Sequence, residues 1–290
     1  MTANPCTLLV DNGSHRAEST LSLRRIAKDL GSRVSSEVNP VSLLHSTRVD
    51  PGDLGGTPAQ IFAPFLKKQR ELGHDSFLVI PFFFGHSAAI YEYLPQRIRE
   101  MREGWPELEV RVAPPMVRID EPEDARVAAI LGDLVVRKIS EEGLVRPAVT
   151  LVDHGTPRAA VNKVRNHVAG QLAEILGDQV STVEASSMER REGDEYAFNE
   201  PLLEKLLGKD QFRREVVLSM LFISPGRHAG PGGDISMIRE EAEKNHEELR
   251  TYASDLFATH PEVIDLLAER FAQGLSDLPI SGEVPAPDAL

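Results

Sequence analysis

One nine-residue pattern occurs twice in this chain, and it constrains the fold more than any other feature. LVDNGSHRA at residues 9–17 returns as LVDHGTPRA at residues 151–159, a shift of 142 positions. The same shift aligns three further pairs: Val41 with Val183, Arg48 with Arg190, and His86 with His228. Similar βαβ segments would share apolar positions, but they would not share the polar residues of the pattern. We therefore predict the duplication of one domain.

Short apolar runs alternate with longer amphipathic segments in both halves. The runs expected to be strands cover residues 7–11, 40–44, 77–84, 109–113, 148–153, 180–188 and 215–223. The segments with apolar residues three and four positions apart, as in helices, cover residues 17–32, 58–72, 88–102, 122–139, 158–176, 201–207 and 235–250. This alternation predicts an α/β fold of two tandem domains, each a parallel β-sheet flanked by helices, with a cleft between them.

The expected domain limits follow from the repeat. We assign residues 1–143 to an N-terminal domain and residues 144–280 to a C-terminal domain, with the hinge at helix 122–139 and the segment 141–147 after it. Residues 281–290, the proline- and acid-rich stretch SGEVPAPDAL, are expected to be disordered.

Charge and cysteine content exclude several classes of protein. The 290 residues carry a formal charge of −13, which argues against nucleic-acid binding. The single cysteine, Cys6, cannot form an internal disulfide or a cysteine-only zinc site. No apolar run has the length of a membrane span, and the sequence does not start like a secretory signal. We expect a cytoplasmic globular protein with no membrane partner.

Two histidines of the second half follow predicted strands. His154 comes after the run 149–152, and His228 follows the run 216–223 and opens the glycine-rich segment HAGPGGD. Ligands of parallel α/β sheets bind beyond the carboxyl ends of the strands. Each histidine alone could be an ordinary turn residue, but together they predict a site at one edge of the sheet.

Two acidic residues lie on or after the second strand of this half, Glu184 within it and Glu189 at its end. A buried carboxylate is costly unless it is paired or binds a cation. Two imidazoles and a carboxylate suit a divalent metal such as Fe²⁺, Co²⁺, Ni²⁺ or Zn²⁺, with one coordination position left open. Either glutamate could instead pair with a neighbouring arginine.

The first half carries a reduced copy of these residues. At the shift of 142, Asn12 stands opposite His154, Ser42 opposite Glu184 and Thr47 opposite Glu189, while His86 remains a histidine. An asparagine amide is a poor ligand for these metals. We expect one active half and one half that contributes Asn12 and His86 to substrate binding. His15 is expected to be a surface or turn residue.

Three arginines lie near the predicted edge in an otherwise acidic protein: Arg158, Arg190 and Arg227. Such side chains bind the carboxylates of a polyanionic substrate through charge-assisted hydrogen bonds. Ordinary solvated charges are the alternative for each of them.

Three segments resemble a known family. VDHGTPR at 152–158 is similar to its His-Gly-Ser-Arg turn, PGRH at 225–228 with GDI at 233–235 to its Gly-Gly-His and Asp-Ile-Pro segment, and VEASSME at 183–189 to its acidic second strand. The family is the class II tetrapyrrole chelatases, of the sirohydrochlorin cobalto/ferrochelatase (CbiX/SirB) type. The resemblance covers most of the chain as two tandem domains.

The resemblance implies a lyase-type enzyme that inserts Co²⁺ or Fe²⁺, with Ni²⁺ also conceivable, into sirohydrochlorin for cobalamin or sirohaem biosynthesis. His154 and His228 would bind the metal and accept pyrrole protons. The third partner is left open, because one subgroup's pattern matches Glu184 and another's matches Glu189. No organic cofactor is implied, since the metal is itself a substrate, and the duplicated chain is expected to be a monomer.

Two other functions fit the same residues. A non-catalytic tetrapyrrole or metal carrier would keep the binding residues without turnover. A metal-dependent hydrolase would use the same ligands, but the sequence offers neither a nucleophile nor an oxyanion motif for it.

Overall fold

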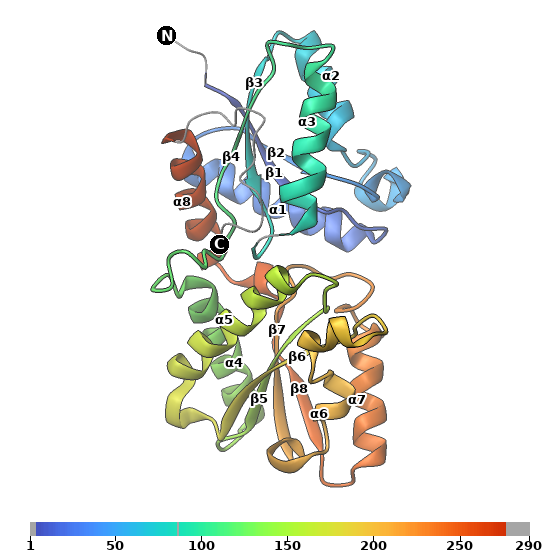
Figure 1. Ribbon diagram of the computed structural model, residues 1–290, viewed down its shortest axis with the longest axis vertical. Coiled ribbons are helices and arrows are strands. Elements are labelled where there is room, and N and C mark those ends of the chain that lie inside the picture. Colours follow the sequence, from blue (N-terminus) through green and yellow to red (C-terminus); the bar gives the residue numbers. More distant parts are fainter. Residues whose placement is uncertain (1–3, 86, 277–290) are drawn as a thin grey trace. The chain divides into compact units, whose positions relative to one another are not determined.

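The computed structural model describes residues 4–85 and 87–276. It contains two four-stranded, wholly parallel sheets with helices on their faces, as the sequence predicts (Figure 1). The predicted disordered tail, residues 281–290, lies outside the described residues, as does His86. Among the described residues, no helix combines the length and apolar character needed to cross a membrane.

The first sheet has the strand order β2-β1-β3-β4. Its strands are β1 (Cys6–Asp11), β2 (Val38–Ser42), β3 (Ser76–Pro81) and β4 (Glu109–Val112). The helices that follow them along the first part of the chain are α1 (Ala17–Val34), α2 (Phe62–Glu71) and α3 (Leu94–Arg102), the last preceded by a π-helical turn, η3 (Ala89–Tyr93). Apolar side chains of α2, α3 and the sheet form one buried cluster that includes Phe62, Phe77 and Trp105.

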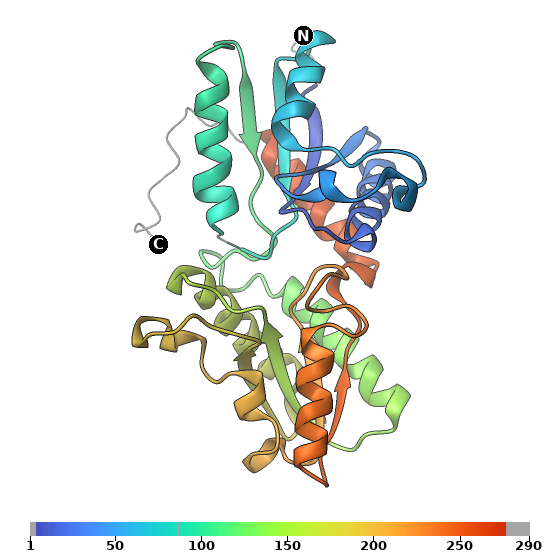
Figure 2. The ribbon, with the colours of Figure 1, turned by 90° about the vertical axis from the view of Figure 1, so that its right-hand side faces the viewer.

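The second sheet repeats this order as β6-β5-β7-β8. Its strands are β5 (Ala148–Asp153), β6 (Thr182–Ser187), β7 (Glu215–Met220) and β8 (Arg250–Ala253). The helices are α4 (Arg126–Glu142), α5 (Ala159–Leu176), α6 (Leu203–Leu206) and α7 (Asp234–Asn245). Helices α4 and α5 lie on one face of the sheet and α6 and α7 on the other (Figures 1 and 2). The sequence analysis missed β8, because it extended the preceding helix to Arg250.

The two compact units do not coincide with the two sequence repeats. Among the described residues, the first unit consists of 4–85, 87–120 and 261–276, and the second of 121–260, whereas the expected limits were 1–143 and 144–280. The last helix of each repeat causes the difference. Helix α4 packs against α5 and β7, while α8 (Glu262–Ser276) packs against α1, β3 and β4 of the first unit. Helix 126–142 is thus a structural part of the second unit.

Close backbone contacts hold α8 on the first sheet. The Arg270 side chain is fully buried and donates hydrogen bonds to the carbonyl oxygens of Pro115 and Met116. A Cβ atom on Gly274 would lie 2.7 Å from the Leu78 side chain and 2.8 Å from the Ala113 Cβ atom. The absence of a side chain at Gly274 therefore permits the helix to approach the sheet this closely.

The uninterrupted shift of 142 holds for the first strand and helix of each repeat but fails beyond them. Helices α1 and α5 correspond at this shift, but Ser42 pairs with Asp11 while Ser187 pairs with Asp153, a shift of 145. The extra residues follow α5 as the 3₁₀ turn η4 (Gly177–Gln179). The third strands are related by a shift of 139, since Cys6 pairs with Phe77 and Ala148 with Val216.

This register corrects the expected equivalences. Ser187, not Glu184, is the structural counterpart of Ser42. Leu44, not Thr47, is the counterpart of Glu189, because the Leu44 amide donates to the Asn12 carbonyl oxygen just as the Glu189 amide donates to that of His154. The strand register also removes the basis for aligning His86 with His228 at the shift of 142.

Candidate active site

Two histidine rings meet at the carboxyl edge of the second sheet. His154 directly follows β5, and His228 lies in the loop between β7 and α7. The chain leaves β5 first toward β6 and later returns on the other side as β7, so the loops after β5 and β7 flank the topological switch point where α/β sheets bind ligands. The two ring centroids are 4.5 Å apart, and the predicted pair is therefore brought together.

A tight turn positions His154. Gly155 has φ of +90°, and a Cβ atom there would lie 1.9 Å from the Glu189 carbonyl oxygen. The carboxylate of Asp153 accepts a hydrogen bond from the Gly155 amide at 3.0 Å and another from the Ser187 hydroxyl at 2.6 Å. These contacts fix the backbone on both sides of His154. The Asp-x-Gly pattern therefore encodes this turn, because aspartate binds its backbone and glycine allows its conformation.

Glycines also shape the loop that carries His228. A Cβ atom on Gly233 would lie 2.6 Å from the Arg227 carbonyl oxygen and 2.7 Å from that of His228. The Ile235 amide donates to the His228 carbonyl oxygen at 3.1 Å, so the loop folds back onto the start of α7. This closure places Asp234, the first residue of α7, beside the His228 ring.

Hydrogen bonds fix the tautomers of both rings. Nδ1 of His228 is 2.5 Å from Oδ2 of Asp234, and Nδ1 of His154 is 3.0 Å from the Gly155 carbonyl oxygen. A carbonyl or carboxylate oxygen only accepts, so each Nδ1 carries the hydrogen and donates it. In the neutral rings, the lone pair available for a metal or a proton is consequently on Nε2 of each histidine.

Glu189 lies beside one of the two rings. Its Oε1 is 3.5 Å from Nε2 of His154, and both side chains are substantially exposed. With His154 neutral, two atoms that each offer a lone pair face each other across this gap, an arrangement that suits a cation bound between them. This geometry distinguishes Glu189 from the other predicted glutamate.

The structure places Glu184 away from the two histidines. It pairs with Thr150 in the middle of the strands, about 10 Å before the end of β6 at about 3.3 Å per residue. Its exposed side chain lines a pocket of about 730 Å³ together with Glu200, Lys205 and Lys209. Glu184 is exposed because β6 is an edge strand, so it lacks the buried setting that made it a candidate ligand.

Within the described residues, no group of three or more His, Cys, Asp or Glu side chains is arranged to hold a metal ion. The structure brings together two imidazoles with Glu189 close to one of them. This is a more open cluster than the three-ligand site that the sequence predicts.

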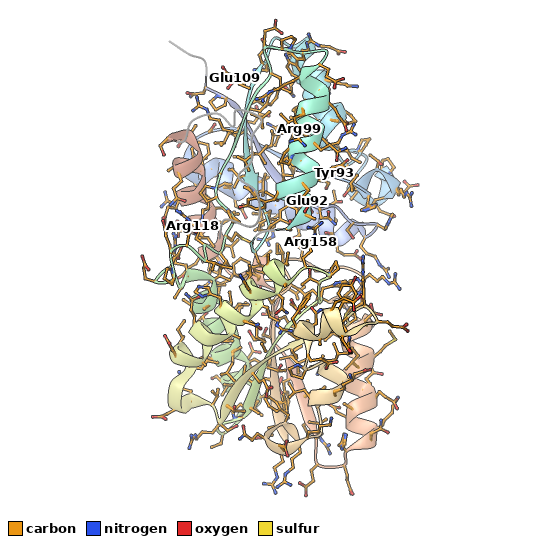
Figure 3. The ribbon with its side chains drawn as sticks, in the orientation of Figure 1. Glu92, Tyr93, Arg99, Glu109, Arg118 and Arg158 are labelled. Carbon is orange, nitrogen blue, oxygen red and sulfur yellow. The ribbon has the colours of Figure 1, made fainter. Side chains whose placement is uncertain are left out.

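The three predicted substrate-binding arginines have different surroundings. Arg190 donates to the Glu200 carboxylate at 2.9 Å and to the Gly193 carbonyl oxygen at 2.8 Å, so it closes its own loop. Arg158 is the N-cap residue of α5 and is exposed (Figure 3). Arg227 is also exposed and immediately precedes His228. Arg158 and Arg227 are therefore exposed in loops next to the candidate site, and Arg190 is bound within its own loop.

The sequence analysis missed a buried network beneath His154. Arg165 of α5 is buried and donates to the Ser187 hydroxyl at 2.5 Å and to the Asn199 carbonyl oxygen at 2.9 Å. Asn199 in turn accepts from the Thr156 amide and donates to the Thr156 carbonyl oxygen, both at 2.9 Å. An arginine on the otherwise apolar face of helix 158–176 was the available sequence signal.

Burial governs the electrostatics of this network. It raises the pKa of the Asp153 carboxyl, while the Ser187 hydrogen bond and the charge of Arg165 lower it. Burial also lowers the pKa of the Arg165 guanidinium. The network thus supports the His154 turn with charges that are held inside the fold.

The first unit has the same turn without the two site histidines. Gly13 has φ of +85°, and a Cβ atom there would lie 1.7 Å from the Leu44 carbonyl oxygen. Asn12 occupies the place of His154, is exposed, and has Leu44 opposite it where the second unit has Glu189. This unit has kept the backbone of the turn and lost the site chemistry.

Comparisons with known proteins agree with this geometry. Residues 148–274 match the CbiX family model, and no curated protein sequence matches the chain. SirB from Bacillus subtilis with Fe³⁺ is 14% identical and superimposes with a TM-score of 0.65 over 94% of this chain and 96% of that one. The sirohydrochlorin chelatase SirB from Bacillus subtilis subspecies spizizenii, in complex with cobalt, is 14% identical with a TM-score of 0.62 over 93% and 95% of the two chains.

A third structure is described as CbiX, the terminal enzyme for biosynthesis of sirohaem in denitrifying bacteria. It is 16% identical, with a TM-score of 0.59 over 94% of this chain and all of that one. The match to the family model begins at β5 and ends in α8, so it contains both site histidines. The chain therefore has the two-domain fold of the SirB and CbiX chelatases, and its segment 148–274 carries the CbiX family pattern.

Proposed function

We propose that this protein inserts a divalent metal ion, Co²⁺ or Fe²⁺, into sirohydrochlorin. The observation that carries the proposal is the pair His154 and His228, whose ring centroids are 4.5 Å apart. In both neutral rings the hydrogen is on Nδ1, so each Nε2 has a lone pair available for a metal ion. This pair lies inside the segment that matches the CbiX model. The metal ion is a substrate of the reaction.

The ring separation suits a shared metal ion. Two imidazole nitrogens that bind one ion at about 2.1 Å place their ring centroids about 4.5–5.3 Å apart, for coordination angles of about 90–110°. The 4.5 Å separation lies in this range. Imidazole is a suitable ligand for iron, cobalt and nickel alike, so the ligand set leaves the choice of metal open. One SirB structure contains Fe³⁺ and another contains cobalt.

Proton removal is the other requirement of the reaction. Sirohydrochlorin holds inner N–H protons that must leave when the metal enters. An imidazole with a pKa near neutrality accepts such protons efficiently, and Glu189 beside His154 would stabilise the resulting imidazolium. Asp234 would do the same for His228 through Nδ1.

Substrate binding would use the exposed arginines. Sirohydrochlorin carries carboxylate side chains around its rim, and guanidinium groups bind carboxylates through paired hydrogen bonds. Arg227 adjoins His228 in sequence and Arg158 begins α5, so both belong to loops of the candidate site. Arg190 is left out of this role because Glu200 and Gly193 already bind it.

A carrier that binds the tetrapyrrole or the metal without turnover is the second candidate. The incomplete third-ligand position favours it, because Glu189 contacts only one of the two rings and the described residues contain no three-ligand group.

A metal-insertion assay separates the two functions. Sirohydrochlorin is incubated with Co²⁺, Fe²⁺ or Ni²⁺, and product is followed by absorbance with and without protein. The enzyme predicts catalysed insertion that His154→Ala and His228→Ala abolish while tetrapyrrole binding persists. Equal rates with wild type, with either variant and without protein would reject the enzyme and leave the carrier.

A matched pair of glutamate variants tests the third partner. Glu189→Gln should lower the insertion rate because it removes the carboxylate beside His154. Glu184→Gln is the control, since this carboxylate lies in the same unit but away from the site. Loss of activity in Glu184→Gln alone would contradict the assignment of Glu189.

A further inference from the structure

The first unit contains another pair of neighbouring histidines, at positions that do not correspond to those of His154 and His228. His15 lies in the loop after β1 and His45 in the loop after β2, and both side chains are exposed. Their ring centroids are 5.2 Å apart with an interplanar angle of 44°. Neither ring has a hydrogen bond or ion pair within the described part of the chain.

The backbone around the two rings is tied together. The Ser14 amide donates to the Ser46 hydroxyl at 3.2 Å, and this hydroxyl donates to the Ser42 hydroxyl at 2.9 Å. His15 directly follows Ser14 and His45 directly precedes Ser46, so each histidine is next to a residue of the hydrogen bond that joins the two loops. The contact between the rings results from this fixed arrangement and not from two independent mobile loops.

His45 itself has a costly backbone conformation. It has φ of +67° and ψ of −39°, and the Ser46 amide donates across it to the Leu44 carbonyl oxygen at 2.8 Å. This is a γ-turn with positive φ, which is rare and strained for residues other than glycine. Non-glycine residues in such conformations concentrate at ligand-binding and active sites.

We propose that His15 and His45 bind a divalent transition-metal ion in the first unit. The 5.2 Å separation lies in the range of about 4.5–5.3 Å expected for two imidazoles on one ion at about 2.1 Å. Two imidazoles suit Co²⁺, Ni²⁺, Cu²⁺ or Zn²⁺, with water molecules in the remaining positions. The net charge of −13 also favours the approach of cations.

This site differs from the candidate active site. At the local shifts between the units, Pro157 stands opposite His15 and Arg190 opposite His45, so the second unit has no equivalent pair. The proposal does not depend on the insertion of metal into sirohydrochlorin. Metal binding by His15 and His45 would remain if the chain proved to have no chelatase activity.

Calorimetric titration with CoCl₂ tests the proposal on the full chain. The background is His154→Ala with His228→Ala, which removes the other imidazole pair. We expect one Co²⁺ per chain in this background, with absorbance bands of imidazole-bound cobalt. Adding His15→Asn or His45→Asn should weaken Co²⁺ binding by about tenfold or more. Loss of a residue that only supports a metal ligand already has an effect of this size, and here the ligand itself is lost.

His74→Asn is the matched control, because His74 is another exposed histidine of the first unit and is not in ring contact with either residue. With His74→Asn, the dissociation constant for Co²⁺ should equal that of the background protein. Asparagine tolerates positive φ, so His45→Asn should fold, as thermal melting would verify, and His15→Asn decides the question if it does not. Absence of Co²⁺ binding in the background, or binding that His15→Asn leaves unchanged, overturns the proposal.

Discussion

The two units contain the same turn after their first strand, but only the second unit has a buried cation near the aspartate of that turn. Asp11 and Asp153 occupy the same position at the end of the first strand in each sheet. In the second unit the cation of Arg165 reaches Asp153 through the Ser187 hydroxyl. In the first unit the residue opposite Arg165 is Leu23, and the buried Oδ1 of Asp11 has no hydrogen-bond partner among the described residues.

The consequence is visible in the acidity of Asp11. Burial raises its pKa to about 6, although hydrogen bonds from Ser42 and Gly13 oppose the shift. The first unit thus lacks both the site histidine and the charge network beneath it. The second unit has kept His154 together with the buried groups that hold its turn in place.

The largest expected effect comes from making the second unit resemble the first at the site. His154→Asn should lower the metal-insertion rate by about 10²–10⁴-fold, because it removes a metal ligand and a proton acceptor. Asn12→His is the reciprocal change and should not restore insertion when combined with His154→Asn, since Leu44 and not a glutamate lies opposite it. Steady-state absorbance assays measure both, and an active His154→Asn enzyme would contradict the assignment of the site to the second unit.

Replacing the buried Arg165 should have the second-largest effect. Arg165→Leu introduces the residue that the first unit has, and should lower the free energy of unfolding by about 2–4 kcal/mol. The loss arises because the Ser187 hydroxyl and the Asn199 carbonyl oxygen lose their buried donor, and Asp153 loses the nearby positive charge. Urea unfolding followed by circular dichroism measures it, and unchanged stability would show that the network is dispensable.

Asp234 should affect activity more than stability. Asp234→Asn should reduce metal affinity or insertion rate by about 10–100-fold, the usual effect of removing a partner that orients a ligating histidine. The reason is that an amide no longer selects the tautomer with hydrogen on Nδ1 of His228. Titration with Co²⁺ and the insertion assay should both report the loss, while the melting temperature stays close to that of the wild type.

Asp11→Asn should have the smallest effect, with the opposite sign. The folded-state pKa of about 6 exceeds the usual 3.8, so the folded state binds more protons between these values and stability falls as pH rises through this window. Replacing the carboxyl by an amide should therefore stabilise the protein by about 1–3 kcal/mol at pH 7.5. Urea unfolding at pH 4.5 and 7.5 checks this, and a destabilised Asp11→Asn at pH 7.5 would contradict the described burial.

Much of the fold followed from periodicity. The strand 148–153 was predicted to the residue and the helix 158–176 to within one residue, because apolar runs and amphipathic spacing persist there. The exchange of α4 and α8 between the units was not predictable, since both helices have an apolar face that any sheet could bury. The missed β8 has only four residues and follows a helix without a strong stop signal.

The site shows a similar division. The meeting of His154 and His228 was predicted from strand ends, and the structure places Glu189 beside His154 and Glu184 in the middle of β6, away from the rings. The three-residue turn after α5 changes which residues of the two halves correspond, and an ungapped comparison cannot reveal it. The supporting groups Asp234, Arg165 and Asn199 depend on loop closure in space, which sequence spacing does not encode.

Anomalous diffraction from crystals of the full chain soaked in Co²⁺ shows whether the two histidines of the second unit share a metal ion. We expect a cobalt peak bound to Nε2 of both His154 and His228 at about 2.1 Å. A second unit without cobalt at these two rings, in crystals where the ion is bound elsewhere, would contradict it.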